Sequence, residues 1–275
     1  MNKERLVYSV LSAVMFISGA ALLFYYYWAN GYIDMPVAQG ISEEEVEYTN
    51  PSLPKQIVPT VSETTETEET AETTGEYEIH NQYKSAIDFD QLKKTNSEII
   101  GWIQMASPEI SAPILMSETD DSYYLSHGPN GKYSKKGSFF IEKSFNDPEF
   151  EDPVTIIYGH RKSDGSMFGS LQKTLENIDI KANPQYIEIY LPNSTKIYRI
   201  VATIRHDSSH VLSYNNFDQE AEFINFFDKV YSSKGTGVQL VAEERPEYGD
   251  RVLILSTCFK TDRTNRFLVI AKELT

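Results

Sequence analysis

The chain has a single cysteine, Cys258, which follows the apolar run 252–255 after Ser256 and Thr257. A deprotonated thiol is a good nucleophile for acyl transfer. One cysteine cannot form an internal disulfide, so in an oxidising compartment this thiol is either buried and inert or kept for reaction.

A nucleophilic thiol needs a proton partner, usually histidine, and a donor for the oxyanion that it creates. His160 follows the apolar run 154–158 after Gly159. This pattern predicts a strand whose end holds the imidazole on a rigid base. The alternative is a structural histidine that caps the strand.

The other four histidines lie in polar or turn sequences, at His80, His127, His206 and His210. His206 and His210 have an i, i+4 spacing that could bind a metal on a helix. The intervening 207–209 does not favour a helix, so we predict no metal and no cofactor.

Arg266 opens a second apolar run, 267–270, eight residues after Cys258. If the two runs are antiparallel neighbours, the loop 259–265 returns Arg266 to Cys258. A guanidinium stays charged and cannot act as a base, but it can donate hydrogen bonds to an oxyanion or a substrate carbonyl. Arg263, in the same loop, is a second candidate for this role. The alternative for Arg266 is an ordinary surface arginine with no part in the chemistry.

Short runs rich in Ile, Val, Phe and Tyr, separated by Gly, Pro, Asn and Asp, predict a mainly β domain. We expect strands at 99–105, 112–115, 137–141, 154–158, 187–191, 196–204, 252–256 and 266–272. About eight strands favour a closed or nearly closed β-barrel. Helices are expected at its N-terminal side (83–94), at 167–175, and at 220–231, inserted before the cysteine strand.

The N-terminal part predicts a membrane anchor followed by a tether. Residues 6–28 are uncharged and end in aromatics, and Lys3 and Arg5 precede them, so residues 1–5 would be cytoplasmic. A cleaved signal peptide is the alternative. Residues 29–80 form an acidic stretch, with eleven Glu and one Lys in 41–80, too poor in apolar residues to fold. We expect a single-pass cell-membrane protein with an extracellular domain at 81–275, and the acidity argues against nucleic-acid partners.

Several of these motifs together resemble those of class B sortases, the membrane-anchored cysteine transpeptidases of Gram-positive bacteria. The stretches that carry the resemblance are 255–258 (LSTC), Arg266 with its strand, 158–160 (YGH), 164–171, 96–103, 123–125 and the helix at 220–231. The resemblance covers essentially all of 85–275. It departs from the class pattern at Arg161, where Asn is common, and at 259–261, where an acid often follows the cysteine.

The resemblance implies a sortase-like closed barrel with Cys258 as nucleophile, His160 as acid and base, and Arg266 as oxyanion or substrate donor. It implies cleavage after Thr in the C-terminal sorting signal of a secreted protein, through a thioacyl intermediate, and transfer to a peptidoglycan-precursor amine. Hydrolysis is implied when no acceptor is present. Ser256 and Leu125 are predicted to line the substrate groove.

Three other functions remain open. A pilin-polymerising sortase would use a lysine amine as acceptor. A cysteine peptidase or cell-wall hydrolase of the papain type carries its cysteine before its histidine, whereas His160 precedes Cys258 here. A non-enzymatic surface binding module would keep its cysteine buried.

Overall fold

The computed structural model describes residues 85–274. Its strands are β1 (Ile99–Ala106), β2 (Glu109–Leu115), β3 (Phe139–Phe140), β4 (Val154–Tyr158), β5 (Tyr186–Tyr190), β6 (Thr195–Asp207), β7 (Gln239–Leu240), β8 (Val252–Cys258) and β9 (Asn265–Glu273). All eight expected strands are present within a few residues of their predicted bounds. The two-residue β7 was not predicted.

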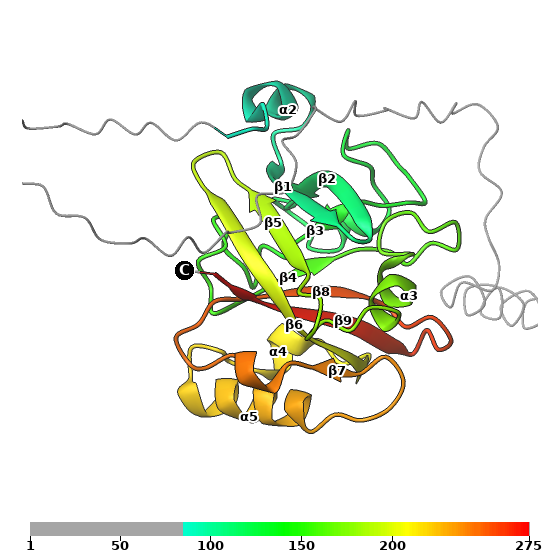
Figure 1. Ribbon diagram of the computed structural model, residues 1–275. Coiled ribbons are helices and arrows are strands. Elements are labelled where there is room, and N and C mark those ends of the chain that lie inside the picture. The colour runs from blue at the N-terminus through cyan, green and yellow to red at the C-terminus, as the bar shows by residue number, and fades with distance from the viewer. Residues whose placement is uncertain (1–84, 275) are drawn as a thin grey trace, which may run out of the picture. The chain divides into compact units, whose positions relative to one another are not determined.

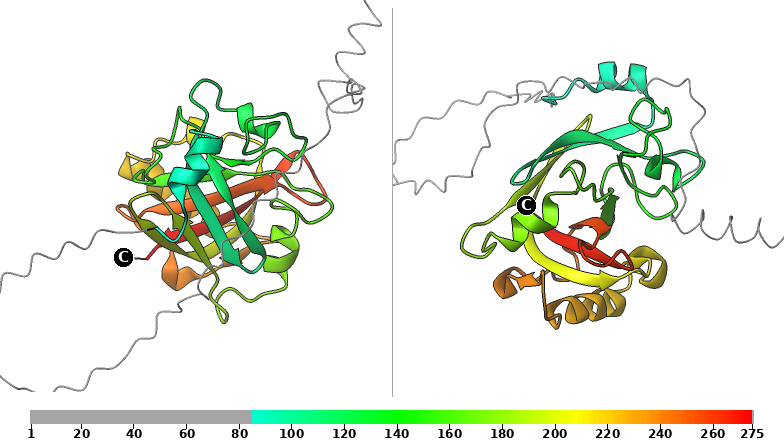
Figure 2. Two further views of the ribbon diagram at one scale, coloured as in Figure 1. Left: turned by 90° about the horizontal axis from the view of Figure 1, so that it is seen from above. Right: turned by 90° about the vertical axis from the view of Figure 1, so that its right-hand side faces the viewer.

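Eight of these strands close into a barrel. The order of hydrogen-bonded neighbours is β5-β1-β2-β3-β4-β8-β9-β6-β7, and a further pairing of β5 with β6 completes the ring. Figure 2 shows the curved sheet, and Figure 1 shows β7 at the edge of β6. The prediction of a mainly β, closed eight-stranded barrel is therefore confirmed.

The helices lie in the connections between strands. They are α2 (Phe89–Thr95), α3 (Leu171–Glu176), α4 (Val211–Tyr214) and α5 (Glu220–Tyr231), with short 3-10 turns η1 (Tyr123–Leu125) and η2 (Ala242–Glu244). The helix expected at 220–231 has its predicted bounds. The expected 83–94 and 167–175 helices begin later, because Asp88 caps α2 and Met167 has a positive φ of 54°. The short α4 was not predicted.

Alternation along the strands separates two apolar cores. Leu253 and Leu255 of β8 point into the barrel, together with Phe267 and Val269 of β9. Val252 and Ile254 point outward into a second core, with Leu268 and Ile270 of β9 and the apolar stripe of α5. Helix α5 therefore covers the outer face of the β8–β9–β6 part of the sheet, as Figure 1 shows.

Gly159 is the point at which β4 leaves the barrel wall. A Cβ atom there would lie 2.6 Å from Phe168 and 2.7 Å from Phe139, two buried rings. We expect Gly159→Ala to lower the free energy of unfolding by about 3 kcal/mol, because an overpacked core must shift its side chains. Denaturant unfolding would measure this loss.

Gly128→Ala is the matched control for Gly159→Ala. Its added Cβ would lie 3.3 Å from the flexible end of the Asn130 side chain and at ordinary contact distances, 3.6 Å and 3.8 Å, from Ser134 and Lys132. A stability change within about 0.5 kcal/mol is expected for it. Equal stability of the two variants would show that contact of an added Cβ with Phe168 and Phe139 does not destabilise the fold.

The expectation of a single-pass membrane protein with a cytoplasmic N-terminus is corrected here. Within residues 85–274 no helix has both the length and the apolar character needed to cross a bilayer, so the structure does not support a membrane anchor. The segments predicted as tail (1–5), anchor (6–28) and tether (29–80) lie outside the described residues.

Candidate active site

Cys258 and Arg266 face each other across two antiparallel strands. They are the last paired residues of β8 and β9, and the guanidinium Nη1 lies 3.9 Å from Sγ. Alternation from Ile254 and Leu268 places both side chains on the outer face of the sheet. The thiol is half-buried, so it is not sealed inside the barrel. The predicted proximity of Cys258 and Arg266 is therefore what the fold produces.

His160 comes to the same end of the sheet on the neighbouring strand. β4 and β8 are parallel and pair Tyr158 with Ser256, and the Gly159 amide continues the ladder by donating to the Ser256 carbonyl at 3.2 Å. His160 and Cys258 each follow that last pair by two residues. The imidazole and the thiol therefore leave adjacent strands at one edge.

The main chain of η1 orients the imidazole. His160 Nε2 lies 2.7 Å from the carbonyl oxygen of Leu125, and a carbonyl can only accept, so Nε2 carries a proton. Nδ1 is then the nitrogen available for proton exchange. Leu125 itself is exposed at 44%, beside the histidine.

Gly137 supports this contact and was not identified as a site residue from the sequence. Its φ is +63°, and a Cβ would lie 2.7 Å from the carbonyl oxygens of Tyr124 and Leu125 and 3.1 Å from the His160 ring. We expect Gly137→Ala to lower kcat/KM for acyl transfer about tenfold, since it displaces the carbonyl that holds His160. Steady-state kinetics would measure the loss.

Gly131→Ala is the matched control for Gly137→Ala. Gly131 has a similar φ of +73°, but nothing lies within 4 Å of its added Cβ. It therefore reproduces the backbone strain without the contact to the site. If both variants lost activity equally, the contact of Gly137 with His160 and Leu125 would not matter.

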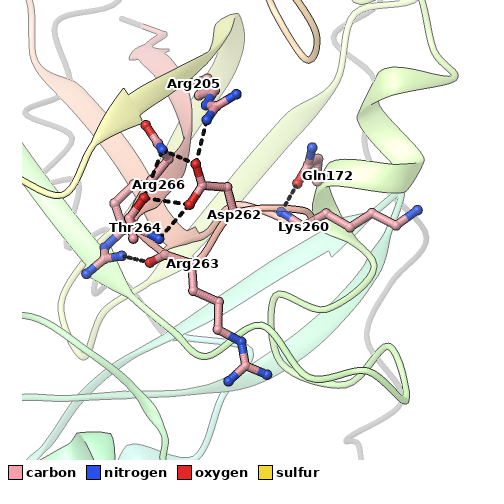
Figure 3. Close-up of polar contacts among 8 residues, drawn as sticks. Gln172, Arg205, Lys260, Asp262, Arg263, Thr264 and Arg266 are labelled. Carbon is pink, nitrogen blue, oxygen red and sulfur yellow. Dashed lines mark hydrogen bonds and ion pairs between the residues drawn. The ribbon is translucent and has the colours of Figure 1, made fainter. Parts of the chain in front are cut away.

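The β8–β9 loop, residues 259–264, is held by its own acid. The Asp262 carboxylate accepts from the Thr264 amide at 3.0 Å and from Arg205 at 2.7 Å, as Figure 3 shows. The Thr264 hydroxyl bond lowers the pKa of Asp262 most, and the Arg205 charge adds to it. Asp262 therefore serves the loop and does not orient His160.

Two further contacts fix the loop from outside. The buried Gln172 of α3 accepts from the Lys260 amide at 2.8 Å. Arg161, next to His160, donates to the Lys260 carbonyl at 3.2 Å. Arg266 also donates to the Arg263 carbonyl at 3.1 Å, and Figure 3 shows the Arg263 side chain extending away from Arg266. Arg263 supplies a carbonyl here, whereas Arg266 supplies the guanidinium beside the thiol.

The remaining described histidines have structural partners. His127 stacks on Tyr123 at 3.7 Å, and His206 contacts the Asp207 carbonyl at 3.0 Å. His210 caps α4 through Nδ1 and pairs with Glu142 through Nε2 at 2.8 Å. His80 lies outside the described residues.

Tyr158 lies on the outer face of β4 near these groups. Burial raises its pKa far above the ordinary value, and the Glu142 charge adds to this effect. Tyr158 therefore stays a neutral phenol and is not a candidate base.

The two predicted groove residues differ in exposure. Leu125 is open to solvent, whereas the Ser256 side chain is only 7% exposed within β8. Their roles in substrate binding stay predictions.

Comparison with known proteins shows which sequences and folds this chain resembles. No protein-family model matches the chain. It is 32% identical over 169 residues to the sortase B of Listeria monocytogenes, covering 61% of this chain and 65% of that protein. It is 25% identical over 188 residues to the sortase B of Staphylococcus aureus, covering 67% of this chain and 73% of that protein.

A solved structure of sortase B from Bacillus anthracis has the same fold. It superposes with a TM-score of 0.58 and 27% identity, covering 70% of this chain and 88% of that chain. The closed barrel, which holds a thiol and a guanidinium at one end of neighbouring strands, therefore has the fold of the solved sortase B structures. In sequence and in fold the chain is similar to class B sortases. It spans just under two thirds of the length of the Listeria relative.

Proposed function

We propose that this protein is a cysteine transpeptidase. Cys258 would attack the carbonyl of the Thr in a C-terminal sorting signal, and the resulting thioacyl enzyme would pass its acyl group to an amine of the cell wall. The observation that carries the proposal is the 3.9 Å approach of Arg266 to the Cys258 sulfur, at the strand end next to His160.

Each side chain has a role that suits its position. The Cys258 thiolate forms the C–S bond, and the carbonyl oxygen becomes an oxyanion for which Arg266 is the nearest charged donor. His160 gives a proton to the leaving amine as the C–N bond breaks. It then takes a proton from the incoming amine, which attacks the thioester and frees the thiolate.

The Leu125 carbonyl makes the imidazole suited to both proton transfers. It fixes the ring through Nε2–H at 2.7 Å and leaves Nδ1 to exchange the proton. It also steadies the imidazolium by accepting from a positively charged ring. No carboxylate is needed for this arrangement, which fits the use of Asp262 elsewhere.

The test separates a transferase from a hydrolase. The full chain is incubated with peptides carrying candidate sorting signals, with and without a triglycine acceptor, and products are identified by mass spectrometry. Amide product with acceptor, and free acid without it, are expected, together with a thioacyl adduct on Cys258. Free acid alone, despite abundant amine, would identify a peptidase, and no cleavage of any peptide would refute the proposal.

A further inference from the structure

A cavity of about 480 Å³ lies beside the first residues of β4, away from the strand ends at the candidate active site. Residues 144–145 and 152–154 form one wall, and residues 212–218 with Glu222 form the other. The second wall belongs to α4, α5 and their connection, which Figure 1 shows on the same side of the sheet. None of the three groups of the proposed acyl transfer lines this cavity.

Hydrogen bonds fix both walls of the cavity. The buried amide of Asn146 donates to the Val154 carbonyl at 2.8 Å and accepts from the Ile156 amide at 3.0 Å, which holds the first wall against β4. In the second wall the Asn216 amide donates to Glu222 at 2.5 Å. These contacts make the walls rigid, and a rigid site loses less entropy when a ligand binds.

A row of rings connects the cavity with the candidate active site. Phe145 of the first wall lies 4.8 Å from the His210 ring, and His210 lies 6.2 Å from Tyr158, measured between ring centroids. Tyr158 pairs with Ser256, which comes two residues before Cys258. A ligand that extended from the thiol along β4 towards the cavity would therefore lie over Tyr158 and His210.

The separation of the cavity from the thiol fits an extended peptide. Val154, in the first wall, pairs with Val252, and Cys258 lies six residues beyond Val252 on β8. Each residue of a strand advances about 3.3 Å, so the cavity begins about 20 Å from the thiol along the strands. An extended peptide covers this distance in about six residues.

The side chains of the cavity suit a basic ligand. Its acids are Asp152, Asp218 and Glu222, and its lining within residues 85–274 contains no Lys or Arg. None of these three acids forms an ion pair in that part of the chain. Tyr214 is 75% exposed and Phe145 is 40% exposed, and an aromatic ring attracts a cation to its face. A lysine or arginine side chain offers an apolar stem to the rings and a charge to the acids.

We propose that this cavity binds a lysine or arginine side chain of the donor protein, about six residues ahead of the scissile Thr. The inference rests on the proposed transpeptidase function. The acyl part of the donor stays bound through both steps, whereas the leaving and incoming amines exchange at one place, so a distant subsite serves the acyl part best. The chain's own residues 41–80, with eleven Glu and one Lys, have the wrong charge for this cavity.

A lysine scan of the donor peptide tests the position. A sorting peptide that the full chain cleaves is extended by a run of serines ahead of its motif, and a single Lys replaces each serine in turn. At ~50 mM salt we expect Lys about six residues ahead of the scissile Thr to raise kcat/KM about fivefold over the all-serine peptide. At ~0.5 M salt the advantage is expected to shrink, because exposed charges are screened.

The position dependence separates the cavity from the overall charge of the protein. Lys at the same distance on the leaving side of the scissile bond is expected to give no advantage. An advantage of equal size at every position, or on the leaving side, would reflect only the net charge of −15 and would contradict the proposal. The absence of an advantage at any position would also overturn it.

Variants locate the effect in the cavity. Asp218→Asn with Tyr214→Ala is expected to remove most of the advantage of the lysine peptide, whereas Tyr214→Phe keeps the ring and should retain it. Glu220→Gln is the matched control, because Glu220 is exposed, lies two residues from Asp218 and does not line the cavity. Since the readout is a ratio of two peptides within one variant, a general loss of activity does not mimic it. An advantage that survives the double substitution would place the lysine elsewhere and refute the site.

A binding measurement keeps this inference separate from the proposed function. The full chain with Cys258→Ala is titrated against fluorescent sorting peptides that carry either Lys or Ser at the best position of the scan, or six residues ahead of the Thr if nothing is cleaved, and anisotropy gives Kd. We expect Kd about fivefold lower for the lysine peptide, and equal values once Asp218→Asn and Tyr214→Ala are added. If no peptide is cleaved but this difference is found, the transpeptidase proposal fails and the basic-side-chain site stands. If peptides are cleaved but Lys changes neither Kd nor kcat/KM, the cavity proposal fails alone.

Discussion

Cys258→Ala is expected to lower the rate of amide formation by at least about 10⁴-fold, because the reaction then has no nucleophile to form the thioester. Product formation from a sorting peptide and triglycine, followed by mass spectrometry, measures the rate. The thioacyl adduct should disappear with it. Because the side chain is half-buried at a strand end, the melting temperature should change little.

The same residue separates an enzyme from a binding module. An iodoacetamide adduct on native protein is expected at Cys258, since the thiol is partly exposed. A thiol that resists the reagent in the native state, together with full activity of Cys258→Ala, would show that the cysteine is structural and that the site lies elsewhere.

Arg266→Gln is expected to reduce kcat/KM for acyl transfer about 10³-fold, and Arg266→Lys about 10²-fold. Lysine keeps the positive charge but loses the rigid planar group that fixes Nη1, the nitrogen that lies near both Cys258 Sγ and the Arg263 carbonyl. Pre-steady-state acylation, followed by release of the leaving peptide, measures the effect on the first step.

Arg245→Gln is the control for the arginine series. Arg245 pairs with Asp228 on α5, so its loss alters the charge without altering the site. Near wild-type acylation is expected for it. If Arg266→Lys acylated as fast as wild type, the shape of the guanidinium would be irrelevant and charge alone would account for its role.

The strands could be predicted from the sequence because each is a short run of β-branched and aromatic residues between turn formers. Val154–Tyr158 was predicted with its observed bounds. The pairing of Cys258 with Arg266 followed from two apolar runs joined by a short loop. β7 and α4 were missed because two to four residues carry no usable periodicity.

The rest of the site could not be predicted, because it depends on main-chain groups and on distant contacts. The partner of His160 is the carbonyl of Leu125, and every residue type has a carbonyl. Gly137 affects the site through its positive φ and its closeness to that carbonyl, and neither property can be recognised in the sequence. The parallel pairing of β4 with β8 joins residues about a hundred positions apart, which no local pattern reveals.

The pairing of β4 with β8 also determines when during folding His160 and Cys258 come together. Pairing between strands that are distant in sequence forms late, because the entropy cost of closing a large loop comes before any stabilising contact is made. Hairpins such as β1–β2 and β5–β6 can form first. His160 would come next to Cys258 only when β4 pairs with β8. Recovery of catalysis during refolding should therefore lag behind the far-ultraviolet dichroism signal of the early strands.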